Sequence, residues 1–489
     1  MNRRHFIQSA ASSLAAGILR TDESMAATNQ QTRPNFLFMI ADDLTYRGIR
    51  SLGNEEVHTP NLDRLVENGC AFTHCFQQGS WTPAVCIASR MMLLTGLTTF
   101  RALRNSDFTP LWGQTLRKAG YHSYMVGKWH LDPTMLQRCF DEMGPIGLGM
   151  FESTPEAYHR PRQGDTWTPW NRELKGHWLH TQLWQNAATD EIRHSEAIWT
   201  DCAVDYLLHK VSKLHQPFFI YIGFNSPHDP RQSPKEFVEM FPPERIQIPP
   251  NYPPEFPFNN GFLYGRDEQL APFPRTHAAI QLHRSEYYAL IAYLDSQIGR
   301  ILDALERSGK AENTYVIFTA DHGLAVGEHG LMGKQNLFDC SIRIPWIITG
   351  PGVPKGKKVR ELVYQHCTFA TTCELAGIPV PGSVEFPSFA NLIKGDGKPK
   401  FNAVFSRYQD YQRTVRTRDH KLIFYPQANK MQLFDLNQDP WEITNLIERP
   451  SVAQVRDDLT QRLQILQQEL DDPLTLGGRP QYNSHAVNG

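Results

Sequence analysis

The sequence predicts an α/β protein: a large doubly wound, mostly parallel sheet flanked by helices, with a smaller C-terminal α+β subdomain. A continuous apolar run at 35–41 is typical of a strand buried on both faces of a parallel sheet, and further strands are expected at 218–223 and 314–319. Segments of helical period separate these runs, and this alternation is typical of doubly wound sheets. From about residue 400 the pattern changes to short strands at hairpin spacing, followed by a helix over 452–470.

Caps, breakers and periodicity place the other elements of the large domain. A helix follows Thr59, which can cap it, and ends at Gly69. Thr82 can cap a second helix, which contains Cys86, and Pro83 suits its first turn because neither position needs an intrahelical N–H. The other expected elements are a helix that ends at residue 120, strands over 121–126 and 345–349, and helices over 191–214 and 285–307.

Two long segments lack a periodic pattern. Residues 141–190 are rich in Trp, His, Arg and Pro, and residues 231–275 are dense in proline. Irregular segments of this length are usually functional or disordered, so we expect loops around the mouth of a pocket. The tryptophans of the first segment are candidates for stacking on a sugar, with packing in an interface or the core as the alternative. They are Trp167, Trp170, Trp178 and Trp184.

Size and composition limit the class of protein. The chain has 489 residues, too many for one ordinary compact core, so we expect a large domain over 33–399 and a subdomain over 400–489. Hydrophobic residues make up 40% and aromatic residues 11%, as in folded globular proteins. Lysine and arginine number 49 against 51 acidic residues, so the sequence predicts no nucleic-acid partner.

The N-terminus has the order of a targeting segment. Arg3-Arg4 precede a mildly apolar run over 9–19, and small residues follow at 24–27. This order predicts a secretory signal peptide over residues 1–27, and the paired arginines favour the twin-arginine route. We therefore expect a periplasmic or extracellular protein, with a disordered cytosolic tail as the alternative. The apolar run is too short to cross a bilayer, and no later stretch has the pattern of a membrane helix.

Polar side chains follow the ends of four expected strands. They are Asp42 and Asp43, Lys128 with His130, His228, and Asp321 with His322. Open α/β sheets bind ligands outside the carboxyl ends of their strands, so we expect these side chains to form one site. Three carboxylates with few nitrogens suit a hard cation such as Ca²⁺ or Mg²⁺. Taken singly, each also fits a helix cap, a solvated turn or a hydrogen-bonded histidine.

A cysteine and an arginine share one face of the expected helix near residue 86. Cys86 and Arg90 are four residues apart, so the Arg90 side chain can lie beside the Cys86 side chain or a modified form of it. The alternative is a cysteine buried in the core and an arginine whose charge reaches solvent.

The run Cys86-Ile87-Ala88-Ser89-Arg90, followed by Leu94-Thr95-Gly96, resembles the signature of the type I sulfatases of the alkaline phosphatase superfamily. The segment from Asp321 to Lys334 resembles a longer motif of this family, in particular that of its iduronate-2-sulfatase-like branch. The resemblance covers residues 35–352 well and keeps only the general pattern over 353–445. It implies the alkaline-phosphatase-like fold and the hydrolysis of sulfate esters.

In these sulfatases the cysteine is converted to formylglycine, an aldehyde that is hydrated in the resting enzyme. The resemblance therefore implies that a formylglycine-generating enzyme modifies Cys86 during maturation. It also implies one divalent metal ion, Ca²⁺ in preference to Mg²⁺. The implied metal ligands are Asp42, Asp43, the modified Cys86, Asp321 and His322.

The resemblance implies the catalytic roles as well. One hydroxyl of the hydrate attacks sulfur and expels the alcohol, while Lys128 and Lys334 bind the sulfuryl oxygens. His228, or Lys334 beside it, protonates the leaving oxygen. His130 takes a proton from the second hydroxyl so that sulfate is eliminated, and Arg90 holds the hydrate and the carboxylates. The expected substrates are sulfated carbohydrates or small sulfate esters.

Other hydrolases of the superfamily and a non-catalytic binding protein are the alternatives to a sulfatase. A two-metal phosphatase or phosphodiesterase needs Asp-x-x-x-His before the Asp-His pair, but Asp295 is followed by Gly299 at the histidine position. A phosphonate ester hydrolase that uses formylglycine stays open. A non-catalytic binding protein on the same scaffold would have lost the cysteine, the arginine or one of the two lysines, and the sequence keeps all of them. Gln365 stands where relatives usually have an acidic residue.

Overall fold

The computed structural model describes residues 33–147, 183–185, 192–229, 231 and 233–474. The chain divides after Arg33, and residues 34–489 form one unit. The expected signal peptide and most of the tryptophan-rich segment lie outside the described residues, so they stay predictions.

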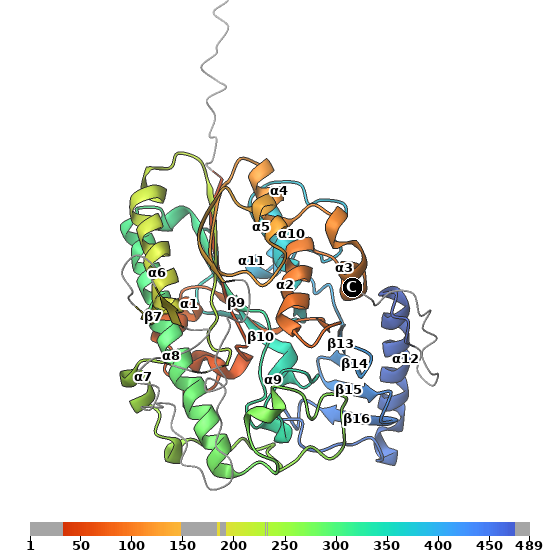
Figure 1. Cartoon of the computed structure of the whole chain (residues 1–489). Helices are drawn as coiled ribbons and strands as arrows, with labels where there is room; N and C mark the ends of the chain where they lie inside the picture. Colours follow the sequence, from red (N-terminus) through yellow and green to blue (C-terminus); the bar gives the residue numbers. More distant parts are fainter. Residues whose placement is uncertain (1–32, 148–182, 186–191, 230, 232, 475–489) are drawn as a thin grey trace, which may run out of the picture. The chain divides into compact units, whose positions relative to one another are not determined.

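A nine-stranded sheet runs through the larger unit (Figure 1). Its middle strands β9 (Thr314–Ala320), β1 (Asn35–Ala41), β8 (Phe218–Gly223) and β4 (His122–Lys128) are parallel neighbours. Every residue of β1, β8 and β9 is buried, which explains why their sequences are mostly apolar. β10 (Arg343–Thr349) runs antiparallel to β9. Because parallel pairs still predominate, the sheet is mostly parallel, as the sequence predicts. The other strands are β2 (Cys70–Phe76), β5 (Glu142–Gly147), β11 (Lys357–Val359) and β12 (Val363–Tyr364).

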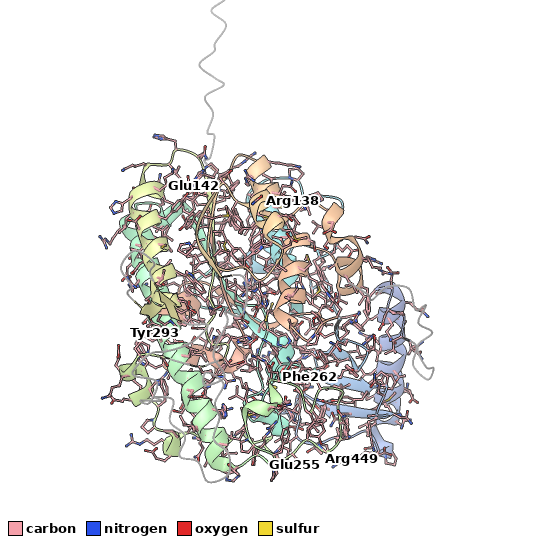
Figure 2. The ribbon with its side chains drawn as sticks, viewed as in Figure 1. Arg138, Glu142, Glu255, Phe262, Tyr293 and Arg449 are labelled. Atoms are coloured by element: carbon pink, nitrogen blue, oxygen red, sulfur yellow. The ribbon has the colours of Figure 1, made fainter. Side chains whose placement is uncertain are left out.

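Helices flank this sheet on both sides (Figure 1). On one side α8 (His277–Arg307) packs against α1 (Pro60–Glu67) and α6 (Ser195–Asp205). Tyr293 of α8, labelled in Figure 2, also meets the ring of Phe237 edge-on. The other side holds α2 (Val85–Thr95), α4 (Trp112–Lys118), α5 (Pro133–Cys139), α10 (Thr368–Leu375) and α11 (Ala390–Lys394). Within the described part of the chain, no helix combines the length and the apolar character needed to cross a membrane.

A second, five-stranded sheet is formed mainly by the C-terminal part of the chain. Its antiparallel strands are β13 (Ala403–Tyr408), β14 (Gln412–Thr417), β15 (His420–Tyr425) and β16 (Lys430–Asp435), and α12 (Ala453–Glu469) packs on β14 and β15. These elements confirm the C-terminal α+β pattern. The fifth strand, β3 (Gly79–Ser80), precedes the helix of Cys86 and runs parallel to β13. Because this sheet uses residues from both sides of residue 400, the domain boundary there stays a proposal.

A buried ion cluster joins the two sheets. Lys421 Nζ of β15 lies 2.8 Å from Oδ1 of Asp339 and 2.7 Å from Oε1 of Glu442. Arg416 of β14 lies 3.2 Å from Oδ2 of Asp339, and these four side chains are at most 4% exposed. Asp339 begins α9 (Asp339–Ile342), which leads directly into β10, so the cluster ties the C-terminal sheet to the central sheet.

Two helix starts differ from the sequence prediction. A cap at Thr82 predicts a helix from Pro83, but α2 begins at Val85. The Thr82 N–H instead donates to Ser80 Oγ at 3.0 Å in the turn before the helix. α8 begins at His277 rather than at residue 285, because the hydroxyl of Thr276 caps the earlier start.

Two longer segments were also predicted wrongly. The helix expected over 191–214 is shorter: α6 ends at Asp205 and continues as a π-helical turn over Tyr206–Lys210 and a 3-10 turn over Val211–Lys213. Residues 142–147, expected in an irregular loop, form β5 beside β4. Edge pairing with β4 supplies hydrogen bonds that the sequence of this segment does not reveal.

Candidate active site

The carboxyl ends of four parallel strands meet at one edge of the central sheet. Asp42 follows β1, Lys128 ends β4, His228 comes after β8, and Asp321 follows β9. Backbone pairing continues beyond the strands, since the Asp42 N–H donates to the carbonyl of Ser226 at 3.1 Å. The polar residues predicted at this edge therefore project from adjacent strands.

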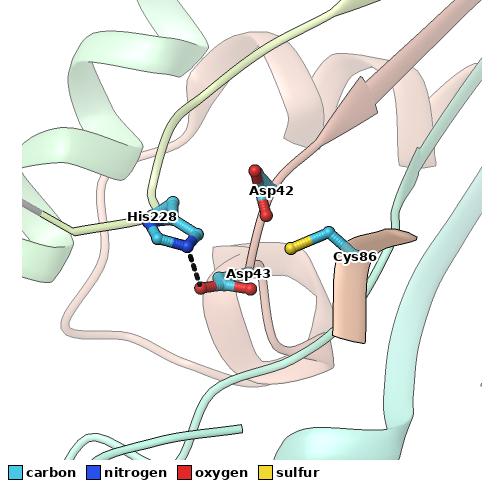
Figure 3. Close-up of side chains that lie close together, drawn as sticks. All are labelled: Asp42, Asp43, Cys86 and His228. Carbon is cyan, nitrogen blue, oxygen red and sulfur yellow. Dashed lines mark ion pairs between the residues drawn. The ribbon is translucent and has the colours of Figure 1, made fainter. Parts of the chain in front are cut away.

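Four buried side chains at this edge form a group suited to a metal ion (Figure 3). One ligand atom from each of Asp42, Asp43, Cys86 and His228 lies within 4.8 Å of the others. Oδ1 of Asp42 is buried and has no hydrogen-bond partner among the residues that the structure describes. A buried, unpaired carboxylate oxygen is costly unless a cation neutralises it, so this donor set fits a divalent ion.

Two lysines supply positive charge inside the group. Lys334 Nζ lies 2.7 and 2.8 Å from the two oxygens of Asp43 and 3.3 Å from Cys86 Sγ. Lys128 forms a buried ion pair with Asp42. Burial acts to lower the pKa of Lys334, but the charge of Asp43 outweighs it, so the pKa lies well above its ordinary value and the ammonium stays charged.

The carboxylates of the site crowd one another. Burial raises the pKa of Asp43 well above its ordinary value against the opposing charge of Lys334, and Asp42 and Asp321 add to the rise. Burial likewise raises the pKa of Asp321, with Asp42 contributing. At Asp42 burial is outweighed by neighbouring cations, Lys128 first, and the pKa is held well below its ordinary value. A bound cation would relieve the remaining repulsion.

The backbone at Asp43 is held in an unusual conformation. Its φ of 66° is in the left-handed region, which costs a non-glycine residue about 1–3 kcal/mol. The Tyr287 hydroxyl of α8 donates to the Asp43 carbonyl at 2.6 Å and accepts from the Thr45 N–H at 3.1 Å. The Asp43 N–H donates to Oδ1 of Asp321 at 3.2 Å. These contacts fix the direction of the Asp43 carboxylate.

Helix α2 delivers Cys86 and Arg90 to the same place. Arg90 donates from Nε to Oδ2 of Asp321 and from Nη1 to the carbonyl of Lys128, both at 2.8 Å. Its side chain is 1% exposed, so the alternative of an arginine that reaches solvent is wrong. Burial raises the pKa of the Cys86 thiol, which is therefore not ionised near neutral pH.

His228 faces the centre of the site with one nitrogen. Nδ1 donates to the Asp229 carbonyl at 2.6 Å, a tautomer assigned because a carbonyl oxygen only accepts. Nε2 lies 3.6 Å from Oδ2 of Asp43 (Figure 3). Burial lowers the pKa of His228 to about 4, and the charge of Lys334 adds to this effect. The neutral ring therefore presents an unprotonated Nε2 to the site.

Two other predicted histidines lie outside the four-residue group. His322 Nε2 accepts from Gln77 Nε2 at 2.7 Å, and its Nδ1 donates to the Gly323 carbonyl at 2.8 Å. His130 has a φ of 60°, and its Nδ1 has no hydrogen-bond partner within the described part of the chain. Burial lowers the pKa of His322 to about 3 and that of His130 to about 2. Both rings are neutral, and their roles as ligand and as base stay proposals.

Several residues of the site were not predicted from sequence. Tyr287 lies in a long amphipathic helix and belongs to no motif, and Asp229 had only its place after the predicted histidine as a signal.

Gln365, which stands where relatives usually have an acidic residue, links β9 to α2. It donates from Nε2 to the Ala320 carbonyl at 2.6 Å and accepts from Ser89 Oγ at 3.1 Å. Because an ionised acidic side chain could not donate to that carbonyl, the amide suits this link between β9 and α2.

Known proteins resemble this chain over most of its length. A family model described as Sulfatase matches residues 34–378, and one described as N-sulphoglucosamine sulphohydrolase, C-terminal, matches residues 327–469. A sulfatase of Formosa agariphila is 29% identical over 460 residues, which cover 87% of this chain and 85% of that protein.

Solved structures show the same fold at lower identity. One solved structure is that of a protein in complex with its substrate, D-glucosamine-2-N,6-O-disulfate. It superposes with a TM-score of 0.71 at 22% sequence identity, over 90% of this chain and 99% of that chain. The phosphonate monoester hydrolase of Agrobacterium radiobacter has a TM-score of 0.70 and 21% identity and covers 90% and 96%.

The chain has the α/β fold of these solved structures, with a mostly parallel central sheet, as the sequence predicts. Open sheets of this class bind their ligands at the carboxyl edge, where the candidate site lies. The family model spans most of the chain, and the protein belongs to the sulfatase family of sulfuric ester hydrolases.

Proposed function

We propose that this sulfatase removes sulfate from carbohydrates, with formylglycine made from Cys86 and one divalent metal ion in its active site. The observation that supports this most is the contact of Lys334 with both Asp43 and Cys86, beside the unpaired Oδ1 of Asp42. Lys334, which can bind an anion, and the Asp42 carboxylate, which can bind a cation, thus lie in one buried site.

The metal ion of this proposal is Ca²⁺, in preference to Mg²⁺. Its proposed ligands are Asp42, Asp43, Asp321 and His322, together with the modified Cys86. His322 would bind the ion through Nε2, in place of its contact with Gln77. Oxygen donors predominate in this set, which suits a hard cation. When bound, the ion supplies positive charge for the oxygens of the sulfuryl group, and formylglycine supplies the attacking oxygen.

Lys128 and Lys334 hold the sulfuryl oxygens in this proposal. Both ammonium groups are nearly inaccessible to solvent and are fixed by carboxylates, so little reorganisation is needed when charge develops on the substrate. Arg90 supports both sides of the site, because it binds the Asp321 carboxylate and the Lys128 carbonyl.

Two histidines move protons in this proposal. His228 protonates the leaving oxygen from Nε2, the nitrogen that faces the centre, and the anionic sulfuryl group favours protonation of the ring against the effect of burial. His130 accepts a proton from the hydrated aldehyde, for which its neutral ring is the competent form.

The proposed enzyme acts outside the cytoplasm after its cysteine has been modified. The charged, apolar and small residues over 1–27 support export to the periplasm or beyond the cell, and a formylglycine-generating enzyme would act on Cys86. A sulfated carbohydrate as substrate is supported by the solved relative whose substrate is a sulfated glucosamine.

Mass spectrometry of the peptide that contains Cys86 tests the modification. After co-expression with a formylglycine-generating enzyme, the peptide should be about 18 Da lighter than its thiol form, whereas sulfenic, sulfinic and sulfonic acids are all heavier than the thiol. Cys86→Ala should abolish turnover and keep the fold. An unmodified Cys86 in active enzyme, or wild-type turnover by Cys86→Ala, would contradict the proposal.

A substrate screen tests the reaction class. We expect sulfated monosaccharides to be hydrolysed with a higher kcat/KM than the matching phosphate and phosphonate esters. The phosphonate hydrolase alternative predicts the reverse order, and wild-type enzyme that binds sulfated sugars without releasing sulfate would favour the non-catalytic alternative.

A further inference from the structure

Arg266 forms a bridge between two loops of the active site. Its guanidinium donates from Nη1 and Nη2 to the two oxygens of Asp229 at 3.1 and 3.3 Å, and from Nε to Oδ1 of Asp267 at 2.7 Å. The Asp229 and Asp267 side chains are 2% and 5% exposed, whereas that of Arg266 is 42% exposed. The arginine therefore covers two buried carboxylates from the solvent side.

On one side the bridge reaches His228. The Asp229 carbonyl accepts from His228 Nδ1 at 2.6 Å, and Oδ1 of Asp229 lies 3.5 Å from the same nitrogen. Holding Asp229 in place therefore holds the imidazole ring, whose Nε2 faces Asp43.

On the other side the bridge reaches Lys334. Oδ2 of Asp267 accepts from Gln335 Nε2 at 2.7 Å, and Gln335 Oε1 accepts from the Lys334 N–H at 3.1 Å. Gln335 Nε2 also donates to the Pro83 carbonyl at 3.2 Å, just before the helix of Cys86. One glutamine thus links Asp267 to the segments that carry Lys334 and Cys86.

Glu268 secures the same loop from the next position. Its carboxylate accepts from the N–H groups of Met332 and Gly333 at 2.8 and 2.9 Å and from Arg275 at 2.7 Å. A Cβ on Gly333 would lie 2.8 Å from Cβ of Asp267, so the loop packs directly on this segment. Arg266 connects the secured loop to the loop of His228.

We propose that Arg266 is a positioning residue for the sulfatase reaction, which sets the separation between His228 and Lys334 by holding Asp229 and Asp267 together. The proposal rests on the roles proposed above for His228 and Lys334. Without the guanidinium, two buried carboxylates that now share one cation would repel each other, and the loops would separate. A shift of about 1 Å in a catalytic group can cost about 100-fold in rate.

The test compares Arg266→Gln with wild type on two sulfate esters. For a sugar sulfate, whose leaving oxygen needs a proton, we expect kcat to fall about 10- to 100-fold at unchanged KM. For 4-nitrophenyl sulfate, whose leaving phenolate is already stable, the loss should be smaller. Arg266→Lys keeps the charge and should restore part of kcat.

A matched control and an activity-independent measurement complete the design. Arg64→Gln removes an ion pair of a similarly exposed arginine, 41%, with Asp303 and should leave both rates unchanged. Hydrogen exchange of peptides that contain residues 225–229 and 331–336 should accelerate in Arg266→Gln and stay unchanged in Arg64→Gln.

Three outcomes would overturn the proposal. A rise in KM at constant kcat would assign Arg266 to substrate binding, and an equal loss on both esters with a lower Tm would make its role purely structural. Unchanged exchange in either loop would show that no bridge exists. If wild type hydrolyses neither ester, the proposed function fails while the exchange measurement still decides the bridge.

Discussion

At the scale of single residues, the charged groups of the site are held by partners on other elements before any substrate arrives. Lys334 spans Asp43 and Cys86, and Arg90 spans Asp321 and the carbonyl of Lys128. Fixed dipoles and charges of this kind stabilise a transition state because they need not reorient during the reaction. The strained backbone of Asp43 belongs to the same arrangement.

Tyr287→Phe tests how much this backbone support contributes. The change removes the hydroxyl that donates to the Asp43 carbonyl and accepts from the Thr45 N–H. We expect affinity for Ca²⁺, measured by calorimetric titration, to fall about 10- to 100-fold, because a group that orients a ligand is lost. Tyr315→Phe is the control. It removes a hydroxyl that donates to the Pro351 carbonyl near the start of β9, away from Asp321, and it should bind Ca²⁺ as wild type does. Equal affinity in both variants would exclude this role for Tyr287.

At the scale of elements, the helix of Cys86 is anchored by the short strand that precedes it. β3 pairs with β13 through Gly79 and Ser80, whose partners are Arg407 and Tyr408. Gly79 has a φ of 87°, and a side chain there would overlap the carbonyl of Arg407. Only glycine combines this backbone conformation with so close an approach.

Gly79→Ala should therefore detach β3 from the second sheet. We expect a loss of about 3 kcal/mol in the free energy of unfolding, since strain and overlap add. Gly53→Ala is the matched control, because Gly53 also has a positive φ, 114°, but open space around a Cβ. Its cost should be about 1 kcal/mol. Thermal unfolding compares the two variants, and equal Tm values would show that the β3 pairing adds nothing.

At the scale of the whole molecule, the buried cluster of Asp339, Lys421, Glu442 and Arg416 connects the two sheets. Burial acts to raise the pKa of Asp339, but Lys421 and then Arg416 outweigh it and hold that pKa well below its ordinary value. Folding therefore gains stability from Asp339 above its ordinary pKa, and this contribution is lost as the pH falls through the folded-state value.

Lys421→Met removes the central cation of this cluster. We expect a loss of about 3–5 kcal/mol near pH 7, because Glu442 loses its cation and Asp339 keeps only its arginine neighbours. Burial already raises the pKa of Glu442, and this pKa rises further without Lys421. The folded state then binds more protons than the unfolded state, so stability should increase as the pH falls from 7 to 5. Tm measured against pH checks the sign. Lys235→Met, which breaks an exposed pair with Glu239, should change little, and a variant Tm that falls with pH would contradict the argument.

Much of the fold could be predicted because its signals are local. The apolar runs that became β1, β8 and β9 are each continuous in sequence, and burial on both faces leaves no other composition for them. The starts of α2 and α8 were predicted less well, since caps depend on hydrogen bonds whose partners compete with other turns.

The sequence by itself determined the mostly parallel sheet, the polar residues at its strand ends and the four-residue spacing of Cys86 and Arg90, because each depends on residues near one another in the chain. Only the tertiary structure decided that Tyr287 supports Asp43, which lies 244 residues away, and that Arg266 joins the loops of His228 and Lys334. Partners so distant leave no periodic or motif signal, since their pairing arises only when packed elements bring two complementary charges or hydrogen-bonding groups together.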